Sequence, residues 1–229
     1  MLGVPLGCDE KAAAYVEGKL FNRLDPMINR LVDFDDSQSA FFLLRVSFTI
    51  VRAVHFMRTT PLSQWKSQAT RFDESVRSAA ESILGVPFTD QVYRQACLTP
   101  RLGGFGLRRT VDHAEVAFSA SWHEAKVTCR EPWAPRDDVK GCLSQKVGSF
   151  KKDQEILQAL ISEAPNQRER QRLSRLQCEH AGAWVSAVPS TLDGGETVMG
   201  HRNFQVAALL RLGLPVSEEV SCSCCMQIG

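Results

Sequence analysis

Eight arginines stand at spacings that would suit contacts with phosphate groups. Three flank a glycine-rich segment, two are seven positions apart in an apolar stretch, and three recur at i, i+4 and i+7 in a polar stretch. Guanidinium groups bind phosphate oxygens, and each such contact adds to a salt-dependent affinity for nucleic acid. The candidates are Arg101, Arg108 and Arg109 in the first group, Arg45 and Arg52 in the second, and Arg168, Arg172 and Arg175 in the third.

Each of these groups also has a structural alternative. Arg45 and Arg52 would share one face of an apolar helix, where an internal salt bridge is the ordinary arrangement because an unpaired arginine is costly to bury. The third group would lie on a solvated helix surface, with Glu169 and Glu179 moderating its charge, and this alternative is favoured over a row of phosphate contacts. For Arg45 and Arg52, a phosphate contact is the more specific of the two hypotheses.

The segment from Arg101 to Arg108 holds three glycines in four positions, Gly103, Gly104 and Gly106. Glycine has no Cβ, so it accepts positive φ angles and close backbone approach. A tight, packed connector between two helices is therefore the favoured interpretation. The backbone amides could instead form an anion-binding concavity, although the spacing matches neither a dinucleotide-binding nor a P-loop fingerprint.

No catalytic residue is predicted from the sequence. The adjacent Asp35 and Asp36 could hold two metal ions, as such pairs do in polymerases. The reverse-transcriptase form has an aromatic residue two positions before the first aspartate, where this chain has Asp33. We therefore interpret the pair as a helix N-cap. The histidines have no serine or cysteine partner at a meaningful spacing.

The cysteines Cys222, Cys224 and Cys225 form an incomplete candidate metal site near the end of the chain. Structural zinc requires four ligands, and no histidine or cysteine follows Cys225. Zinc is not expected here, and no other cofactor is expected in this chain. Without a secretory signal, the cysteines predict no disulfide framework.

The bulk composition is that of an ordinary globular protein. The chain has 229 residues, 44% hydrophobic and 23% charged, with a formal net charge of +1. Any nucleic-acid binding must therefore come from local patches. The apolar stretch 40–57 contains Arg45, Arg52 and His55, which favours a buried helix over a membrane span. We expect an intracellular protein, cytoplasmic or nuclear and not secreted, with no membrane partner.

Helix signals dominate the chain, and clear strand alternation is nearly absent. The prediction is a mostly α fold: a helical bundle followed by a second helical region, with a short N-terminal strand or turn. We expect a first domain at 1–126, a linker at 127–149, a second helical region at 150–216 and a cysteine-containing tail at 217–229. The expected helices cover 9–34, with a kink or restart at Pro26, then 37–58, 61–84 capped by Thr60, 90–98, 110–126, 151–163, 167–187 and 201–212.

Several segments together resemble one family, the non-LTR (LINE-like) retrotransposon reverse transcriptases. The opening LGVPLG at 2–7 is similar to the hairpin after the palm, and Phe42–Arg45 with Phe56–Pro61 is similar to the thumb helices. The glycine segment resembles the family's Gly-Gly-x-Gly-Leu element, followed by a helix of small residues at 114–125. Further resemblances are Gly182–Ser186 with Pro189-Ser190, Phe204 through Leu210–Pro215, and Cys222-x-Cys224.

The resemblance implies a C-terminal fragment covering the end of the palm, the thumb and the downstream connector. Residues 1–126 would then hold a palm-end hairpin and a helical thumb-like bundle, and residues 150–216 the helical connector. Its partners would be an RNA or RNA–DNA template–primer duplex and the remainder of the polymerase. The catalytic aspartates, and the Mg ions that they hold, would belong to a palm that this chain lacks, so no autonomous activity is expected. The alternative is a non-catalytic helical scaffold or protein-interaction module derived from such an element.

Overall fold

The computed structural model describes residues 3, 5, 8–128, 144–189 and 198–216, and it is mostly helical as predicted. Ten α-helices and two 3₁₀ turns account for most of these residues, and none of them lies in a strand. The predicted N-terminal strand is not confirmed, because Gly3, Pro5 and Cys8 lie in irregular backbone and the remainder of 1–7 is outside the described residues.

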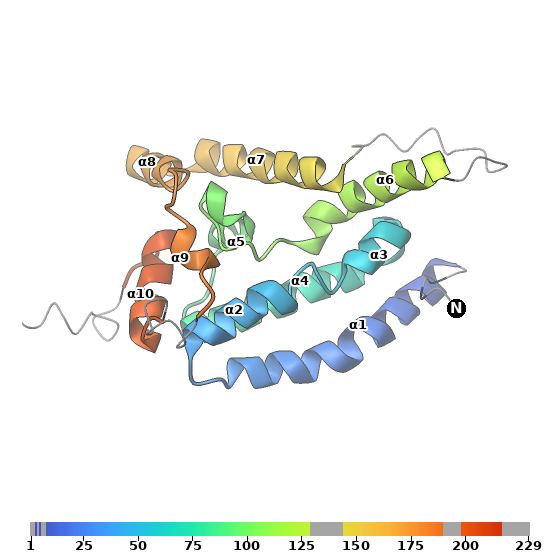
Figure 1. Cartoon of the computed structure of the whole chain (residues 1–229), viewed down its shortest axis with the longest axis horizontal. Helices are drawn as coiled ribbons and strands as arrows, with labels where there is room; N and C mark the ends of the chain where they lie inside the picture. The colour runs from blue at the N-terminus through green and yellow to red at the C-terminus, as the bar shows by residue number, and fades with distance from the viewer. Residues whose placement is uncertain (1–2, 4, 6–7, 129–143, 190–197, 217–229) are drawn as a thin grey trace, which may run out of the picture.

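The helices are stacked in layers. Helix α1 (Asp9–Val32) runs along one side of the molecule and α7 (Gln145–Glu163) along the opposite side, as Figure 1 shows. Between them lie α2 (Ser37–Ser47), α3 (Val54–Thr59) and α4 (Lys66–Leu84), followed by α5 (Asp90–Cys97) and α6 (Thr110–Thr128). The short α8 (Gln167–Arg175), α9 (Ala183–Ser186) and α10 (His201–Leu212) gather at one end.

The expected single helix at 37–58 is wrong, since the chain turns between α2 and α3. Asp36 begins α2 as predicted, because its carboxylate accepts from the amides of Gln38 and Ser39. At the other end, the Thr49 hydroxyl donates to the Arg45 carbonyl at 2.8 Å, and Arg52 Nε donates to the Ser47 carbonyl at 2.8 Å. These side chains satisfy carbonyls that a continuing helix would have used, so the helix ends there.

Two further expectations about helix starts are corrected. Pro26 lies inside the continuous α1 and does not restart it. Thr60 is buried and does not cap α4; its carbonyl accepts from the Trp65 indole at 3.2 Å, and a 3₁₀ turn at Leu62–Gln64 precedes the helix. The end of α4 is as predicted, because Gly85 adopts a left-handed φ of 71° just beyond it.

The region after α6 is more helical at its edges than expected. Helix α6 continues to Thr128 and α7 begins at Gln145, so both ends of the predicted 127–149 linker are helical, and 129–143 lies outside the described residues. The expected helix at 167–187 is wrong in its middle, where α8 ends at Arg175 and turns separate it from α9. His180, with a φ of 65°, lies in these turns.

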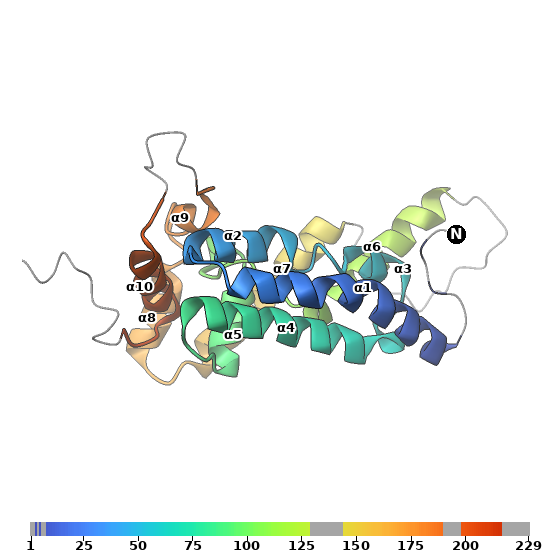
Figure 2. The ribbon, with the colours of Figure 1, turned by 90° about the horizontal axis from the view of Figure 1, so that it is seen from below.

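Aromatic side chains join the N-terminal and C-terminal parts of the chain. Phe41 of α2 and the buried Phe105 have ring centroids 5.1 Å apart, and Phe41 also meets Phe204 of α10 at 5.7 Å. Trp184 of α9 contacts Phe105 and Phe204 edge-on. On the other flank, α1 and α4 lie side by side along much of their length (Figure 2). One main core therefore includes residues from α1 to α6 and from α9 and α10, while leucines of α7 and α8 pack with Leu98 and Leu102 in a second cluster.

Candidate nucleic-acid interface

The glycine segment is a buried turn between α5 and α6. A 3₁₀ turn at Pro100–Leu102 leads into it, and Gly103 and Gly106 have φ angles of 93° and 81°. The amides of Phe105 and Gly106 donate to the carbonyls of Ala96 and Leu98, at 2.9 and 2.7 Å. The amides of Gly103, Gly104 and Leu107 are bonded to backbone carbonyls in the same way. Amides engaged internally are not free to bind an anion, so the segment is no anion-binding concavity.

Gly104 is the most constrained position of the turn. A Cβ built there would lie 2.0 Å from the Leu98 carbonyl oxygen and 2.4 Å from that of Gln95. Both neighbours are backbone atoms, so no side-chain rotation relieves the overlap. The cluster of glycines is explained by packing of the turn against the end of α5.

Arg211 of α10 links this turn to the C-terminal helices through hydrogen bonds. The side chain is buried, and its guanidinium donates to the carbonyls of Pro100, Ala181 and Gly104, at 2.7, 2.8 and 3.3 Å. Burial, together with the smaller effect of repulsion from the Arg172 guanidinium, lowers the pKa of Arg211 to about 10. The charge is retained at neutral pH, and the three carbonyl oxygens compensate its desolvation.

Arg172, a predicted phosphate ligand, belongs to the same buried network. It donates to the Gln95 side chain at 2.6 Å, to the Arg211 carbonyl and to Glu169. Gln95 in turn donates to the carbonyls of Gly103 and Arg211, at 3.1 and 3.0 Å. The predicted row on α8 is therefore divided, with Arg172 turned inward while Arg168 and Arg175 are exposed.

Arg108 is also engaged internally. Its guanidinium lies 2.9 Å from the carboxylate of Asp153 on α7, which is only 1% exposed. The other Asp153 oxygen is 3.2 Å from Nε2 of the buried His113 on α6. Arg108 therefore holds α7 against α6, and its guanidinium is already paired with a buried carboxylate.

Arg109 pairs with Asp112 at 3.7 Å, within the first turn of α6. Beside it, Asp73 of α4 caps that helix from a distance, its carboxylate accepting from the amides of Thr110 and Val111 at 2.7 and 3.0 Å. Burial raises the pKa of Asp73 to about 6, against the lowering effect of these bonds and of Arg109. Arg109 thus lies near two carboxylates, those of Asp112 and Asp73, at the start of α6.

Arg45 and Arg52 are not on one helix face, because α2 ends between them. Arg52 folds back over the end of α2 and its guanidinium lies 5.5 Å from the centre of the Phe48 ring. Arg45 lies 5.6 Å from the centre of the Phe42 ring, and its Cδ is 3.8 Å from where a Cβ of Gly106 would stand. Neither guanidinium has a carboxylate partner in the described part of the chain.

The eight arginines thus differ in pairing and in exposure. The guanidinium groups of Arg108, Arg109 and Arg172 are paired with carboxylates, while Arg45 lies half-buried against the glycine segment. Four are exposed: Arg52, Arg101, Arg168 and Arg175. Burial lowers the pKa of Arg45, which means that its positive charge is partly desolvated without a counter-charge among the described residues.

The residues that hold the helices and the glycine segment in place were not predicted from the sequence. Asp73, Gln95, Asp153 and Arg211 contact partners 37 to 116 positions away. The sequence around each residue does not identify its partner, because the partner is distant along the chain. The available signal for Asp73 was a charged residue beside Phe72 and Val76 on the apolar side of α4.

Metal and membrane features are few in the described residues. These residues contain no group of three or more His, Cys, Asp or Glu side chains that could hold a metal ion, and Cys222, Cys224 and Cys225 lie outside them. None of the described helices is long and apolar enough to cross a bilayer.

Comparison with protein-family models, curated proteins and solved structures found no match to this chain.

Proposed function

We propose that this chain is a thumb-like part of a non-LTR-type reverse transcriptase that binds an RNA or RNA–DNA template–primer duplex without catalysing polymerisation itself. Support comes from the resemblance of its segments and from the mostly helical fold. The observation that carries the proposal is Arg45, a half-buried guanidinium without a carboxylate partner among the described residues. A phosphate would supply the missing counter-charge and offset the cost of desolvation.

The exposed arginines extend the proposed interface. Arg101 belongs to the 3₁₀ turn that leads into the glycine segment, and Arg168 and Arg175 lie on α8. None of these three side chains forms a hydrogen bond or ion pair with another described residue. Contacts of this kind go to the sugar–phosphate backbone, so they would hold a duplex in register and would not read its sequence.

Fluorescence anisotropy with a labelled RNA–DNA primer–template tests the proposal. The variants are Arg45→Glu with Arg101→Glu, and Arg168→Glu with Arg175→Glu, while Arg30→Glu on the exposed side of α1 is the matched control. We expect each double variant to weaken binding at least tenfold. The slope of log affinity against log salt should become shallower by about 2, since each phosphate contact contributes roughly 0.9 on a duplex.

Binding is compared only for variants whose circular dichroism spectrum and urea unfolding curve match those of the starting protein. Absence of binding by the folded starting protein at low salt would contradict the proposal. So would an Arg30→Glu effect as large as that of the double variants.

A non-catalytic helical scaffold is the second candidate, favoured by the internal engagement of Arg108 and Arg172. Arginines that stabilise packing need no nucleic acid to explain them. The same titration separates the two functions, because a scaffold would leave the duplex unbound at every salt concentration.

A further inference from the structure

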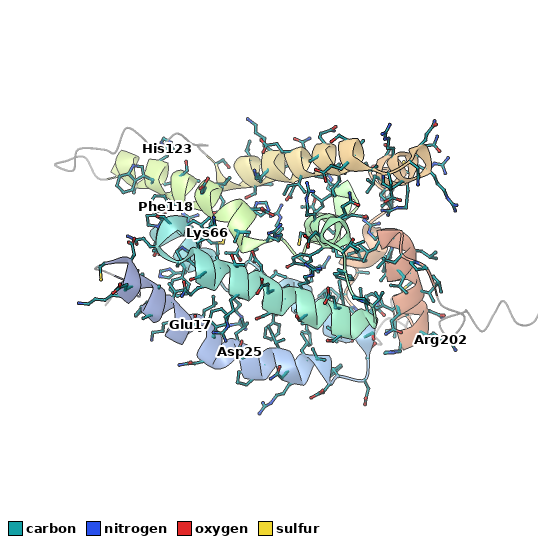
Figure 3. All side chains as sticks on the ribbon, turned by 180° about the vertical axis from the view of Figure 1, so that it is seen from behind. Glu17, Asp25, Lys66, Phe118, His123 and Arg202 are labelled. Carbon is teal, nitrogen blue, oxygen red and sulfur yellow. The ribbon has the colours of Figure 1, made fainter. Side chains whose placement is uncertain are left out.

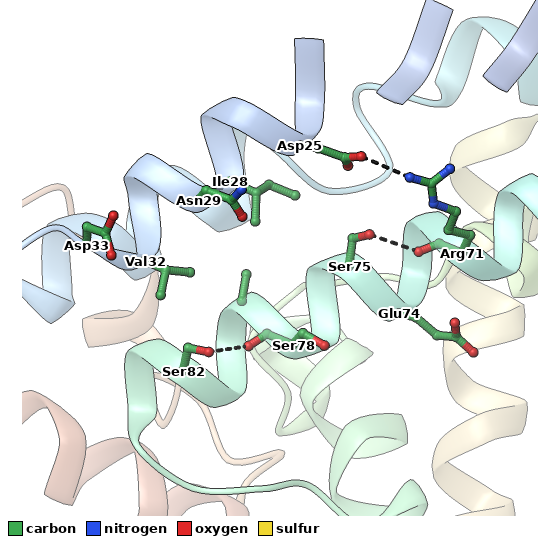
Figure 4. Close-up of a pocket in the computed structure, with 11 residues that line it drawn as sticks. Asp25, Ile28, Asn29, Val32, Asp33, Arg71, Glu74, Ser75, Ser78 and Ser82 are labelled. Atoms are coloured by element: carbon green, nitrogen blue, oxygen red, sulfur yellow. Dashed lines mark hydrogen bonds and ion pairs between the residues drawn. The ribbon is translucent and has the colours of Figure 1, made fainter. Parts of the chain in front are cut away.

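A second surface feature is a groove between the C-terminal half of α1 and α4. The groove has a volume of about 630 Å³ and extends from Asp25 to Asp33 on one helix and from Arg71 to Ser82 on the other (Figure 4). At a rise of 1.5 Å per residue these segments are roughly 12 and 16 Å long. The groove therefore has the length of two to three helical turns.

On the α4 side, the groove is lined by the small side chains of serines at helical spacing. The Ser75 hydroxyl donates to the Arg71 carbonyl at 3.0 Å, and that of Ser82 donates to the Ser78 carbonyl at 2.9 Å (Figure 4). These hydroxyls are satisfied within their own helix, so they need no outside partner. With the apolar Ile28 and Val32 also lining the groove, a helix carrying small or apolar residues could approach closely.

The charge of the groove is negative. Its one cation, Arg71, is already bonded to Glu17 and to Asp25, the latter at 2.9 Å. Asp33 and Glu74 are exposed and have no cationic partner among the residues that the structure describes. Two uncompensated carboxylates would repel a phosphate backbone and attract lysine or arginine.

We propose that this groove docks a basic amphipathic helix of a partner protein. Small or apolar residues of that helix would lie along the serines and Ile28, and cationic side chains at its edge would pair with Asp33 and Glu74. A second copy of this chain in a two-fold dimer would place these carboxylates against themselves, because such interfaces use the same patch twice. The inference holds for either function proposed above, since it concerns a different surface.

The interface would be small and sensitive to salt. Two to three turns bury less surface than a stable complex requires, so the contact belongs to the weak, transient class. Exposed charge pairs mainly set partner choice and association rate, and salt screens them.

Binding to the full chain is tested with two labelled helical peptides. Both carry alanine and leucine along one face; one has lysines at the edges of that face and the other has glutamates. We expect saturable anisotropy binding of the lysine peptide and at least tenfold weaker binding of the glutamate peptide. The double variant Asp33→Lys, Glu74→Lys should weaken binding of the lysine peptide at least tenfold.

Two further variants distinguish binding in the groove from non-specific attraction by the protein's negative charge. Ser78→Trp fills the groove without changing its charge and should also weaken binding at least tenfold. The matched charge control is Glu115→Lys with Glu179→Lys, on exposed positions of α6 and of the turns after α8, and it should bind within twofold of the starting protein.

Several results would overturn the inference. These are equal binding of the two peptides, no effect of Ser78→Trp in a protein that still folds, or displacement of the lysine peptide by the primer–template. Sedimentation showing a dimer that dissociates on Asp33→Lys, Glu74→Lys would assign the groove to self-association instead. Loss of peptide binding leaves the duplex titration unchanged, so the two proposals fail separately.

Discussion

At Gly104 the backbone passes within contact distance of the carbonyls of Gln95 and Leu98. We predict that Gly104→Ala destabilises the protein by about 3 kcal/mol or more, because the new methyl group overlaps backbone atoms that only a shift of the turn can relieve. Urea unfolding followed by circular dichroism measures the change.

Gly18, inside α1, is the control for that substitution. A Cβ there would meet nothing within 4 Å, so Gly18→Ala should stabilise the protein by about 0.5–1 kcal/mol through helix propensity. An unfolding midpoint for Gly104→Ala equal to that of the starting protein would contradict the packing argument.

The sequence predicted some of the residues that shape this turn and not others. Three glycines within four positions indicated a tight turn, because their backbone requirement is local. Arg211 gave no such signal, since its partners Pro100 and Gly104 are more than 100 positions away. The same limit made Arg108 resemble a phosphate ligand, while its carboxylate partner lies 45 positions further on.

Among the elements, α6 depends on a side chain from another helix for its start. Asp73 of α4 accepts from the first amides of α6, and burial raises the pKa of this carboxyl to about 6. In the unfolded chain the value is about 3.9. The folded protein thus binds the proton more tightly than the unfolded chain.

The sign of the pH dependence follows from that difference. The contribution of Asp73 to stability is full below about pH 4 and is lost as the pH rises through about 6. The difference between the two pKa values corresponds to about 3 kcal/mol. Since the unfolded carboxyl is already half ionised near pH 4, we predict that the starting protein loses about 2 kcal/mol of this relative to Asp73→Asn between pH 4 and pH 7.

Urea unfolding of both proteins at four pH values across that range gives the measurement. Asp73→Asn also loses one amide contact, which lowers its stability by a similar amount at every pH. Only the change with pH is therefore diagnostic. A stability difference that stays constant from pH 4 to pH 7 would refute the prediction.

Helix existence was easier to predict than helix ends. Asp36 and Gly85 are local signals, and both act as predicted. The break after Ser47 depends on Arg52 folding back onto a carbonyl, which no periodic pattern reveals. The polar turns after Arg175 likewise resemble a helix until the burial of Val185 and Trp184 against the core is known.

On the scale of the whole molecule, the two predicted helical regions are joined by packing. Helix α10 contacts α2, α4 and α5, while α7 packs on α5 and α6. Phe105, Trp184 and Phe204 belong to one core cluster. The division at 1–126 and 150–216 remains a prediction from composition, and the extent of contact between the regions leads to a direct thermodynamic test.

We predict a single cooperative thermal transition, with the calorimetric enthalpy equal to the van't Hoff enthalpy. Arg211→Met should lower the midpoint of that whole transition by about 6–12 °C, because it removes three buried hydrogen bonds from a charged donor, at a cost of about 3 kcal/mol, in a chain of this size. The control is Arg202→Met at the exposed start of α10 (Figure 3), which should change the midpoint by less than about 2 °C. Two resolved transitions, with only one moved by Arg211→Met, would show that the regions unfold independently and that the buried network does not couple them.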